Sequence, residues 1–358
     1  MNQVDSSGRR LARSLSIERR MESCKGSLAE TGGDKVGRGR LEARRPIHFL
    51  VGMSRSGITP LSRCLNSHPE IAVFGQSRFW GRCYIKPESP AGLTREQLRE
   101  LEDLLCSFDW SATLGANDEG RLQHLSLSGL NALIRKTLGA LDAPSRPGVA
   151  FVRIAQAIGE AERKPCVIEK TPHHLNWITR ILAELPDSRF LVLLAMPYTF
   201  AFILRQQRDM TYHPIAAALL WRACMIAYRR AKRRHGDSIL PLDIGELARD
   251  HVESLEKTAD FLGVQKAPMR ELPNFMAAVL PDDHLDQLLP IDIFWMNRAS
   301  DSVRFDMGDV RRSAAGVSPE MLFRSLTSFP RWGAGLVQTM RGNHKGSLPR
   351  YLLNWLVR

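Results

Sequence analysis

The sequence lacks the features that mark a membrane protein, a metal site or a disulfide scaffold. Its longest apolar run, residues 190–204, is interrupted by Pro197 and is shorter than the roughly 20 residues that a helix needs to cross a bilayer. The N-terminus has no apolar segment of the kind found in secretory signals. The six cysteines are widely spaced, without a C-x-x-C pair or a histidine at zinc-finger spacing. We therefore expect a cytoplasmic protein with reduced thiols, no membrane span and no metal.

Charge is spread unevenly over the 358 residues. The net charge is +12, and residues 1–45 account for +5 of it, with eleven Lys/Arg against six Asp/Glu. This stretch is predicted to be a disordered basic arm. An arm that binds nucleic acid is the alternative, but the stretch has no aromatic residue to stack on bases, so no nucleic-acid partner is expected. The remaining +7 suits an anionic ligand, nucleic acid or an acidic surface alike.

The most informative stretch is residues 49–59, Phe-Leu-Val-Gly-Met-Ser-Arg-Ser-Gly-Ile-Thr. An apolar, strand-like run leads into a loop of small residues, and a helical pattern follows at once. Two glycines let the backbone approach an anion, and the start of the helix contributes inward N–H groups and its positive dipole end. We predict a phosphate-binding loop whose cofactor-binding residues are Ser54, Arg55, Ser56, Gly57, Ile58 and Thr59.

The loop is nearly a nucleotide triphosphatase P-loop. Gly52, Gly57 and Thr59 match the pattern G-x-x-x-x-G-K-[ST], but Ile58 occupies the position of the lysine. Arg55 supplies a cation earlier in the loop instead. A P-loop kinase therefore remains an alternative, disfavoured by Ile58 and by the lack of a Walker B acid after a strand.

From residue 46 onward, strands and helices alternate. Strand-like runs lie at 47–51, 71–74, 166–168, 190–194 and 238–242. Helical patterns lie at 94–107, about 128–142, 149–163, 173–185, from Pro197, from Pro214 and at 251–262. Alternation of this kind predicts an α/β fold, a P-loop-type parallel sheet flanked by helices on both faces. We expect one domain over residues 46–358, with helical insertions and an irregular C-terminal region from 266.

Three motifs follow predicted strands: the loop at 52–59, Glu169-Lys170-Thr171-Pro172, and the turn at 195–197. The carboxyl ends of parallel strands share one edge of a sheet, where ligands bind. The sequence therefore predicts that all three motifs contribute to one site.

Several segments together resemble the sulfotransferase superfamily, particularly its bacterial and carbohydrate-type members. They are the loop, the run Leu61–Glu70 after it, the turn Glu169–Pro172, the strand at 189–192 and the late helix ending in Phe261-Leu262-Gly263. The resemblance covers about residues 46–265. It implies transfer of a sulfuryl group from 3′-phosphoadenosine 5′-phosphosulfate (PAPS) to a hydroxyl of a small-molecule or carbohydrate acceptor, without a metal.

The resemblance also implies roles for individual residues. Arg55 would stabilise the leaving phosphate oxygens, and Lys170 would face the sulfuryl group or the acceptor. Glu169, His173 or His174 would take the proton of the acceptor hydroxyl. Arg341-Gly342-Asn343-His344-Lys345-Gly346 weakly resembles the family's late cofactor loop.

The sequence departs from the family at the cofactor's 3′-phosphate. An R-D-P motif and a serine grip this phosphate in the family, whereas this chain has Ala195, Met196, Pro197 and Ile203. Each lost charge-assisted bond is worth roughly 1.5–3 kcal/mol. These positions look repacked as core, and Arg205 on the following helix is a candidate replacement cation.

A second departure is Gln76, where related proteins often carry a glutamate that serves as base; an amide cannot take a proton. Together the departures leave an alternative open. The chain would then be a catalytically degenerate member that binds a nucleotide or a partner, or one that accepts a donor lacking the 3′-phosphate.

Overall fold

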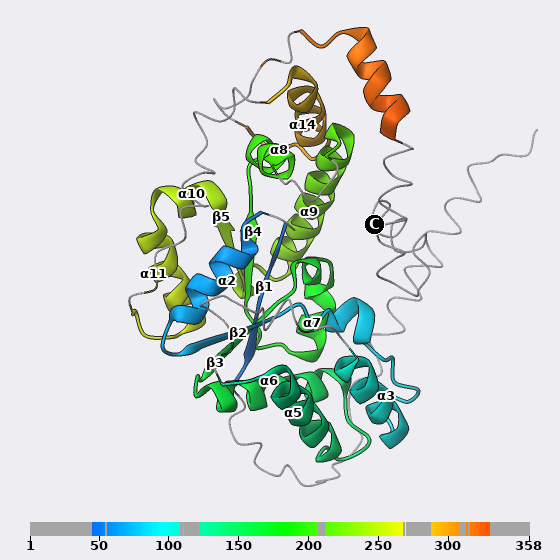
Figure 1. Ribbon diagram of the computed structural model, residues 1–358, viewed down its shortest axis with the longest axis vertical. Coiled ribbons are helices and arrows are strands. Elements are labelled where there is room, and N and C mark those ends of the chain that lie inside the picture. The colour runs from blue at the N-terminus through cyan, green and yellow to red at the C-terminus, as the bar shows by residue number, and fades with distance from the viewer. Residues whose placement is uncertain are drawn as a thin grey trace, which may run out of the picture. The chain divides into compact units, whose positions relative to one another are not determined.

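The computed structural model describes residues 45–53, 56–107, 110, 122, 124–206, 212–267, 269, 288–307, 313 and 316–329. These residues all belong to one compact unit, residues 45–358 (Figure 1). Apart from Arg45, the basic arm predicted for residues 1–45 lies outside the described residues and stays a prediction. The extent of the single domain predicted for residues 46–358 also stays a prediction.

The described residues form a five-stranded sheet in the order β2-β3-β1-β4-β5. All neighbouring strands are parallel. The strands are β1 (Ile47–Gly52), β2 (Ile71–Gly75), β3 (Cys166–Lys170), β4 (Phe190–Leu194) and β5 (Ile239–Asp243). Because helices connect consecutive strands, each strand can run in the same direction as its neighbour. The predicted α/β fold and its parallel sheet are confirmed.

Helices cover both faces of the sheet (Figure 1). Side chains alternate along a strand, so Leu50 of β1 packs in one core while Phe49 and Val51 pack in the other. The first core includes α2 (Ile58–Ser67), α8 (Pro197–Gln206), α9 (Pro214–Arg234), α10 (Ile244–Arg249), α11 (His251–Leu262) and α14 (Pro290–Ser302). The second includes α3 (Arg95–Cys106), α5 (Leu127–Gly139), α6 (Pro147–Glu162) and α7 (Ile178–Glu184).

Local signals in the sequence set several helix ends. A capping box opens α3, since the Thr94 side chain accepts from the Gln97 N–H and the Gln97 side chain accepts from the Thr94 N–H. Helix α11 ends at Gly263, whose φ of 75° is the left-handed conformation that glycine adopts readily. Helix α6 begins two residues earlier than predicted because Pro147 fits the first turn of a helix.

The helix predicted for 173–185 is wrong in its first half. Residues Pro172–Trp177 form a 3₁₀ turn, η2, and α7 begins only at Ile178. The tighter turn goes together with a bond between His174 and Glu169, five residues earlier on β3. A side-chain contact to the strand therefore decides the backbone conformation here, and the helical periodicity does not show it.

The C-terminal region contains more helix than the sequence indicated. Helix α14 packs against α8 and α9, and residues 319–329 form another helix. None of the helices in the described ranges combines the length and apolar character needed to cross a membrane.

Candidate active site

Strands β3, β1 and β4 are neighbours in the sheet, and each is followed by one of the predicted motifs. The pairing register sets Leu50 beside Lys170 and Gly52 beside Leu193. The loop after β1 therefore starts between the turn after β3 and the turn after β4, at the carboxyl edge of the sheet. This is the location in which open parallel sheets bind ligands.

Two glycines shape the loop after β1. Gly52 has a φ of +142°, and a Cβ there would lie 2.2 Å from the carbonyl oxygen of Leu193. Gly57 precedes α2 in the left-handed conformation, with a φ of 88°. Between them, the buried Ser56 donates both its N–H and its hydroxyl to the carbonyl of Met53, at 3.3 and 2.6 Å. The loop therefore turns sharply and brings the N-terminus of α2 to the sheet edge, where its free N–H groups suit an anion.

The predicted cofactor-binding residues of this loop differ in the groups that they can offer to a ligand. The side chain of Ile58 is buried in the core, so this residue can offer only its backbone to a ligand. Thr59 is exposed and presents a hydroxyl at the first turn of α2. Ser54 and Arg55 lie outside the described residues.

The carboxylate of Glu169 is fully buried beneath this edge. One oxygen accepts from Ser77 N–H (3.1 Å), Ser77 Oγ (2.7 Å) and Thr171 Oγ1 (2.5 Å), and the other contacts Nδ1 of His174 at 2.9 Å. Burial alone would raise the pKa of Glu169, but the charge and hydrogen bond of His174 and the bonds from Thr171 and Ser77 hold it below its usual value. The group is therefore an ionised carboxylate that ties the β2 turn to the β3 turn.

His174 is as buried as its partner. Because an ionised carboxylate only accepts hydrogen bonds, Nδ1 of His174 carries the proton that the bond requires. Its ring packs edge-on against Trp80 and Phe49, with centroids 5.6 and 6.1 Å apart. Its Nε2 has no hydrogen-bond partner among the described residues. The geometry thus places Glu169 and His174 inside the protein, behind the turn that carries Lys170.

Lys170 is the last residue of β3 and packs over β2. A Cβ on Gly75 would lie 2.8 Å from its Cε, so the glycine makes room for the lysine stem. Burial lowers the pKa of Lys170; the charge of Glu169 opposes this effect and Arg63 adds to it. The carbonyl of Lys170 accepts from the N–H of Gln76 at 2.6 Å. The Lys170 side chain therefore lies over β2 at the carboxyl edge, with β3 between it and the strand that precedes the glycine loop.

The turn after β2 is conformationally strained. Gln76 and Arg78 have φ values of 54° and 47°, in the left-handed region that non-glycine residues avoid. Strain of this kind gathers at functional sites. The sequence had singled out Gln76 for its missing carboxylate, but it gave no role to Ser77, whose two bonds to Glu169 hold the turn. Serine is too common in loops for its position alone to predict that contact.

His173 is half-buried, unlike its neighbour His174. Burial, aided by Arg78 and His174, lowers the pKa of His173 to about 4. The imidazole is therefore neutral at pH 7 and able to accept a proton. Of the three candidate bases, it is the one with solvent access.

The turn after β4 is apolar where the family has its 3′-phosphate motif. Ala195 and Ile203 are both about 3% exposed and lie in the hydrophobic core. The carbonyl of Ala195 accepts from the indole N–H of Trp221 at 2.9 Å. Ala195 and Ile203 therefore lie in the core as the sequence indicated, whereas Met196 is only half-buried.

Arg205, the candidate replacement cation for the 3′-phosphate, is already engaged in an ion pair. Its guanidinium donates to the buried carboxylate of Asp292 on α14 at 2.7 Å, so a phosphate would have to compete with that ion pair. The glycine-rich segment 341–346 lies outside the described residues. Within the described ranges, no group of three or more His, Cys, Asp or Glu side chains could hold a metal ion.

The fold and the residues at the carboxyl edge of the sheet define a class of protein. It is a parallel α/β domain with a glycine loop at a helix N-terminus and a lysine on the adjacent strand. A sequence model described as "Sulfotransferase family" matches residues 46–268. The chain belongs to the sulfotransferase family. A comparison with curated proteins found no match.

Solved structures of sulfotransferases are similar to this chain. One is a sulfotransferase from Alicyclobacillus acidocaldarius, with 18% identity, a TM-score of 0.42, and coverage of 75% of this chain and 99% of that one. Another is the sulfotransferase domain from the curacin biosynthetic pathway, with 16% identity, a TM-score of 0.42, and coverage of 74% and 99%. A third is the sulfotransferase STF9 from Mycobacterium avium, with 17% identity, a TM-score of 0.40, and coverage of 85% and 83%.

Proposed function

We propose that this protein transfers a sulfuryl group from PAPS to a hydroxyl of a small-molecule or carbohydrate acceptor. The observation that carries the proposal is the adjacency of the glycine loop after β1 and the Lys170 turn after β3. This arrangement supports an anionic, phosphate-bearing donor, because backbone N–H groups and an ammonium converge on one edge. Family membership supports sulfuryl transfer over the P-loop kinase alternative.

In the proposed reaction, the acceptor oxygen forms a bond to sulfur while the bond from sulfur to the bridging phosphate oxygen breaks. The bonding electron pair leaves with the phosphate. Arg55 and the N–H groups of residues 57–59 would neutralise that leaving oxygen, since the Ser56 N–H is already donated to Met53, and Lys170 would neutralise the sulfuryl oxygens. Catalysis then consists of positioning and charge stabilisation, as in phosphoryl transfer.

We propose His173 as the base that takes the acceptor proton. Its neutral imidazole and partial exposure support this assignment. Glu169 and His174 are fully buried and bonded to each other, which favours a positioning role: they would hold the turn that carries Lys170 and His173.

A second candidate is a family member that binds a nucleotide or partner without catalysis. The burial of Ala195 and Ile203 favours it, because these residues replace the motif that the resemblance assigns to the 3′-phosphate. Binding and turnover must therefore be measured separately.

The test is a calorimetric titration of the full chain with the desulfated product, 3′-phosphoadenosine 5′-phosphate. We expect binding with Kd of about 1–100 μM, which corresponds to roughly 5–8 kcal/mol. Arg55→Ala should abolish it, and Arg99→Ala at an exposed position of α3 should leave it unchanged. No binding up to about 1 mM would contradict the donor assignment. Binding without product from PAPS and a panel of alcohols would favour the non-catalytic candidate.

A further inference from the structure

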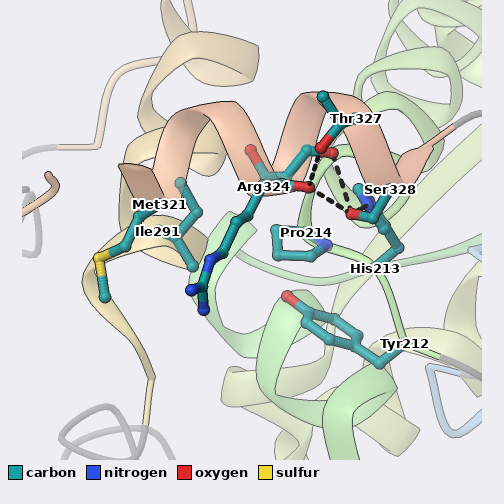
Figure 2. A pocket seen from close by; sticks show the side chains of 9 residues that line it. Tyr212, His213, Pro214, Ile291, Met321, Arg324, Thr327 and Ser328 are labelled. Carbon is teal, nitrogen blue, oxygen red and sulfur yellow. Dashed lines mark hydrogen bonds between the residues drawn. The ribbon is translucent and has the colours of Figure 1, made fainter. Parts of the chain in front are cut away.

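A second feature of the molecule is a cavity of about 610 Å³ beside the start of α9. Three segments line it: the residues that open α9, the start of α14, and the helix 319–329 (Figure 2). Its volume falls within the roughly 300–1,000 Å³ of small-molecule sites. The cavity is separate from the glycine loop, and none of the residues assigned above lines it.

Chain topology places this cavity beyond the carboxyl edge of the sheet, the edge at which the glycine loop also lies. Strand β4 ends at the carboxyl edge and leads into α8, and α9 then returns to the opposite edge to begin the parallel strand β5. The first residues of α9 must therefore lie on the carboxyl side. Helix α14 packs against both α8 and α9, which adds its N-terminal turn to the same region.

Hydrogen bonds between the lining segments fix the walls of the cavity relative to one another. The buried carboxylate of Asp292 accepts from Tyr212 OH (2.8 Å), from Arg205 (2.7 Å) and from the Leu289 N–H (3.0 Å). Across the cavity, Nε2 of His213 lies 3.1 Å from Ser328 Oγ, which links α9 to the helix 319–329. Trp295 donates to Ser325 at 3.2 Å. The site is therefore preformed, which lowers the entropic cost of binding.

The charges around the cavity are balanced among the described residues. Arg324 pairs with Glu320 at 2.6 Å, and Asp292 pairs with Arg205 at 2.7 Å. Burial lowers the pKa of His213, although a hydrogen bond from the ring to the backbone of Ser325 opposes the shift, so its ring is neutral at pH 7. Among the described residues that line the cavity, a charged ligand would therefore meet no charge without a partner.

The cavity surface combines an apolar side with hydrogen-bonding groups. Pro214, Ile291 and Met321 provide the apolar side. Figure 2 shows the Arg324 side chain extending toward the space between Ile291 and Tyr212. A guanidinium has five N–H donors, so Arg324 keeps donors for a ligand oxygen while it contacts Glu320.

We propose that this cavity binds the acceptor, and that the acceptor is an uncharged amphiphile with an apolar body and several hydroxyls. The proposal rests on the sulfuryl-transfer function proposed above. The apolar body packs on Pro214, Ile291 and Met321, and a ligand oxygen accepts from Arg324. One hydroxyl extends from the cavity toward the donor at the carboxyl edge.

The test uses n-hexyl β-D-glucoside as the probe, with n-hexyl sulfate and n-hexylamine as charged analogues of the same chain length. Binding to the full chain is measured by calorimetry. We expect saturable binding of the glucoside, at least about tenfold tighter than either charged analogue, a difference of about 1.4 kcal/mol. Mass spectrometry should detect the sulfated glucoside when PAPS is added.

Met321→Trp fills the cavity from a partly exposed position, so it should fold normally. It should weaken glucoside binding at least about tenfold and leave the titration with 3′-phosphoadenosine 5′-phosphate unchanged. Phe323→Trp is the matched control, since Phe323 lies on the same helix but is 67% exposed and does not line the cavity. It should leave both titrations unchanged.

Three results would overturn the proposal: no saturable glucoside binding, equal binding of a charged analogue, or glucoside binding that Met321→Trp does not weaken. Binding without a sulfated product would also overturn the acceptor assignment. Failure of the proposed function itself is distinguishable, because the wild-type protein would then either fail to bind 3′-phosphoadenosine 5′-phosphate or form no product from any alcohol of the panel. Glucoside binding and its loss in Met321→Trp do not depend on turnover and would be unaffected.

Discussion

Nδ1 of His174 lies 2.9 Å from the carboxylate of Glu169, and neither side chain is exposed to solvent. The pair joins residues of β3 and η2, and Ser77 extends it to the turn after β2. Two neighbouring strands therefore end in turns that share one buried carboxylate. This explains how the edge keeps Lys170 and His173 in place without a metal or a disulfide among the described residues.

Glu169→Ala should be strongly destabilising. It leaves His174, Ser77 and Thr171 without their buried acceptor, and breaking a buried pair from one side costs about 3–5 kcal/mol. Urea denaturation followed by circular dichroism measures the loss. Glu253→Ala, which removes the exposed partner of Lys257, is the control and should leave the midpoint unchanged. A loss below about 1 kcal/mol for Glu169→Ala would mean that the buried network does not support the fold.

His173→Gln should lower kcat by about 10²–10⁴ while donor-product binding persists, since general base catalysis contributes that range. The pH dependence gives a sharper test. Because the pKa of His173 is lowered to about 4, the ring stays neutral until the pH falls through that value. The acidic limb of kcat should therefore lie near pH 4, with folding checked at each pH. An acidic limb near 6.5, the usual histidine value, would argue against His173.

Lys170→Met should lower kcat by about 10²–10³, because it removes a preorganised charge from the developing transition state while keeping most of the side-chain volume. The free energy of unfolding should change little, since Lys170 is a buried cation whose pKa burial already lowers. Steady-state kinetics with PAPS measure the effect. Unchanged kcat would exclude Lys170 from the reaction.

His48 should make stability depend on pH. Burial, aided by Arg189, lowers its pKa to about 4, and its Nδ1 accepts the N–H of Arg189 at 3.2 Å. Between about pH 6.5 and 4 the unfolded chain binds a proton that the folded chain does not, so stability falls as the pH falls. The difference in pKa of about 2.5 corresponds to about 3 kcal/mol.

His48→Asn isolates this contribution. The amide oxygen can still accept from Arg189 but does not titrate. Denaturation curves at pH 7 and pH 4 should show a smaller loss of stability in the variant than in the wild type. Equal losses would contradict the assignment to His48.

Gly52→Ala should destabilise the protein by about 2–5 kcal/mol through backbone strain and overpacking. The added Cβ would lie 2.2 Å from the carbonyl oxygen of Leu193, so β1 and β4 would have to separate at the loop. Gly139→Ala at the end of α5 is the matched control, because its Cβ would meet nothing within 4 Å. Equal thermal midpoints for the two variants would show that the close approach of β1 and β4 is not needed.

Much of this site could be predicted from short stretches of sequence. The glycine loop, the turn Glu169–Pro172 and the repacked turn at 195–197 are each local patterns, and parallel strands bring their carboxyl ends to one edge. Contacts between distant residues could not be predicted in this way. Ser77 and Glu169 are separated by 92 positions, and Arg205 and Asp292 by 87. Neither pair has a spacing that periodicity reveals.

The strands, the α/β fold and the chemistry available at the carboxyl edge could be predicted from the amino-acid sequence, because local propensity and apolar periodicity act over a few residues. Tertiary structure decided which polar groups lie inside. It buried Glu169 with His174, left His173 half-exposed beside them, and paired Arg205 with Asp292 beside a cavity. The reason is that desolvation and hydrogen bonding depend on every element packed around a group, and those elements come from distant parts of the chain.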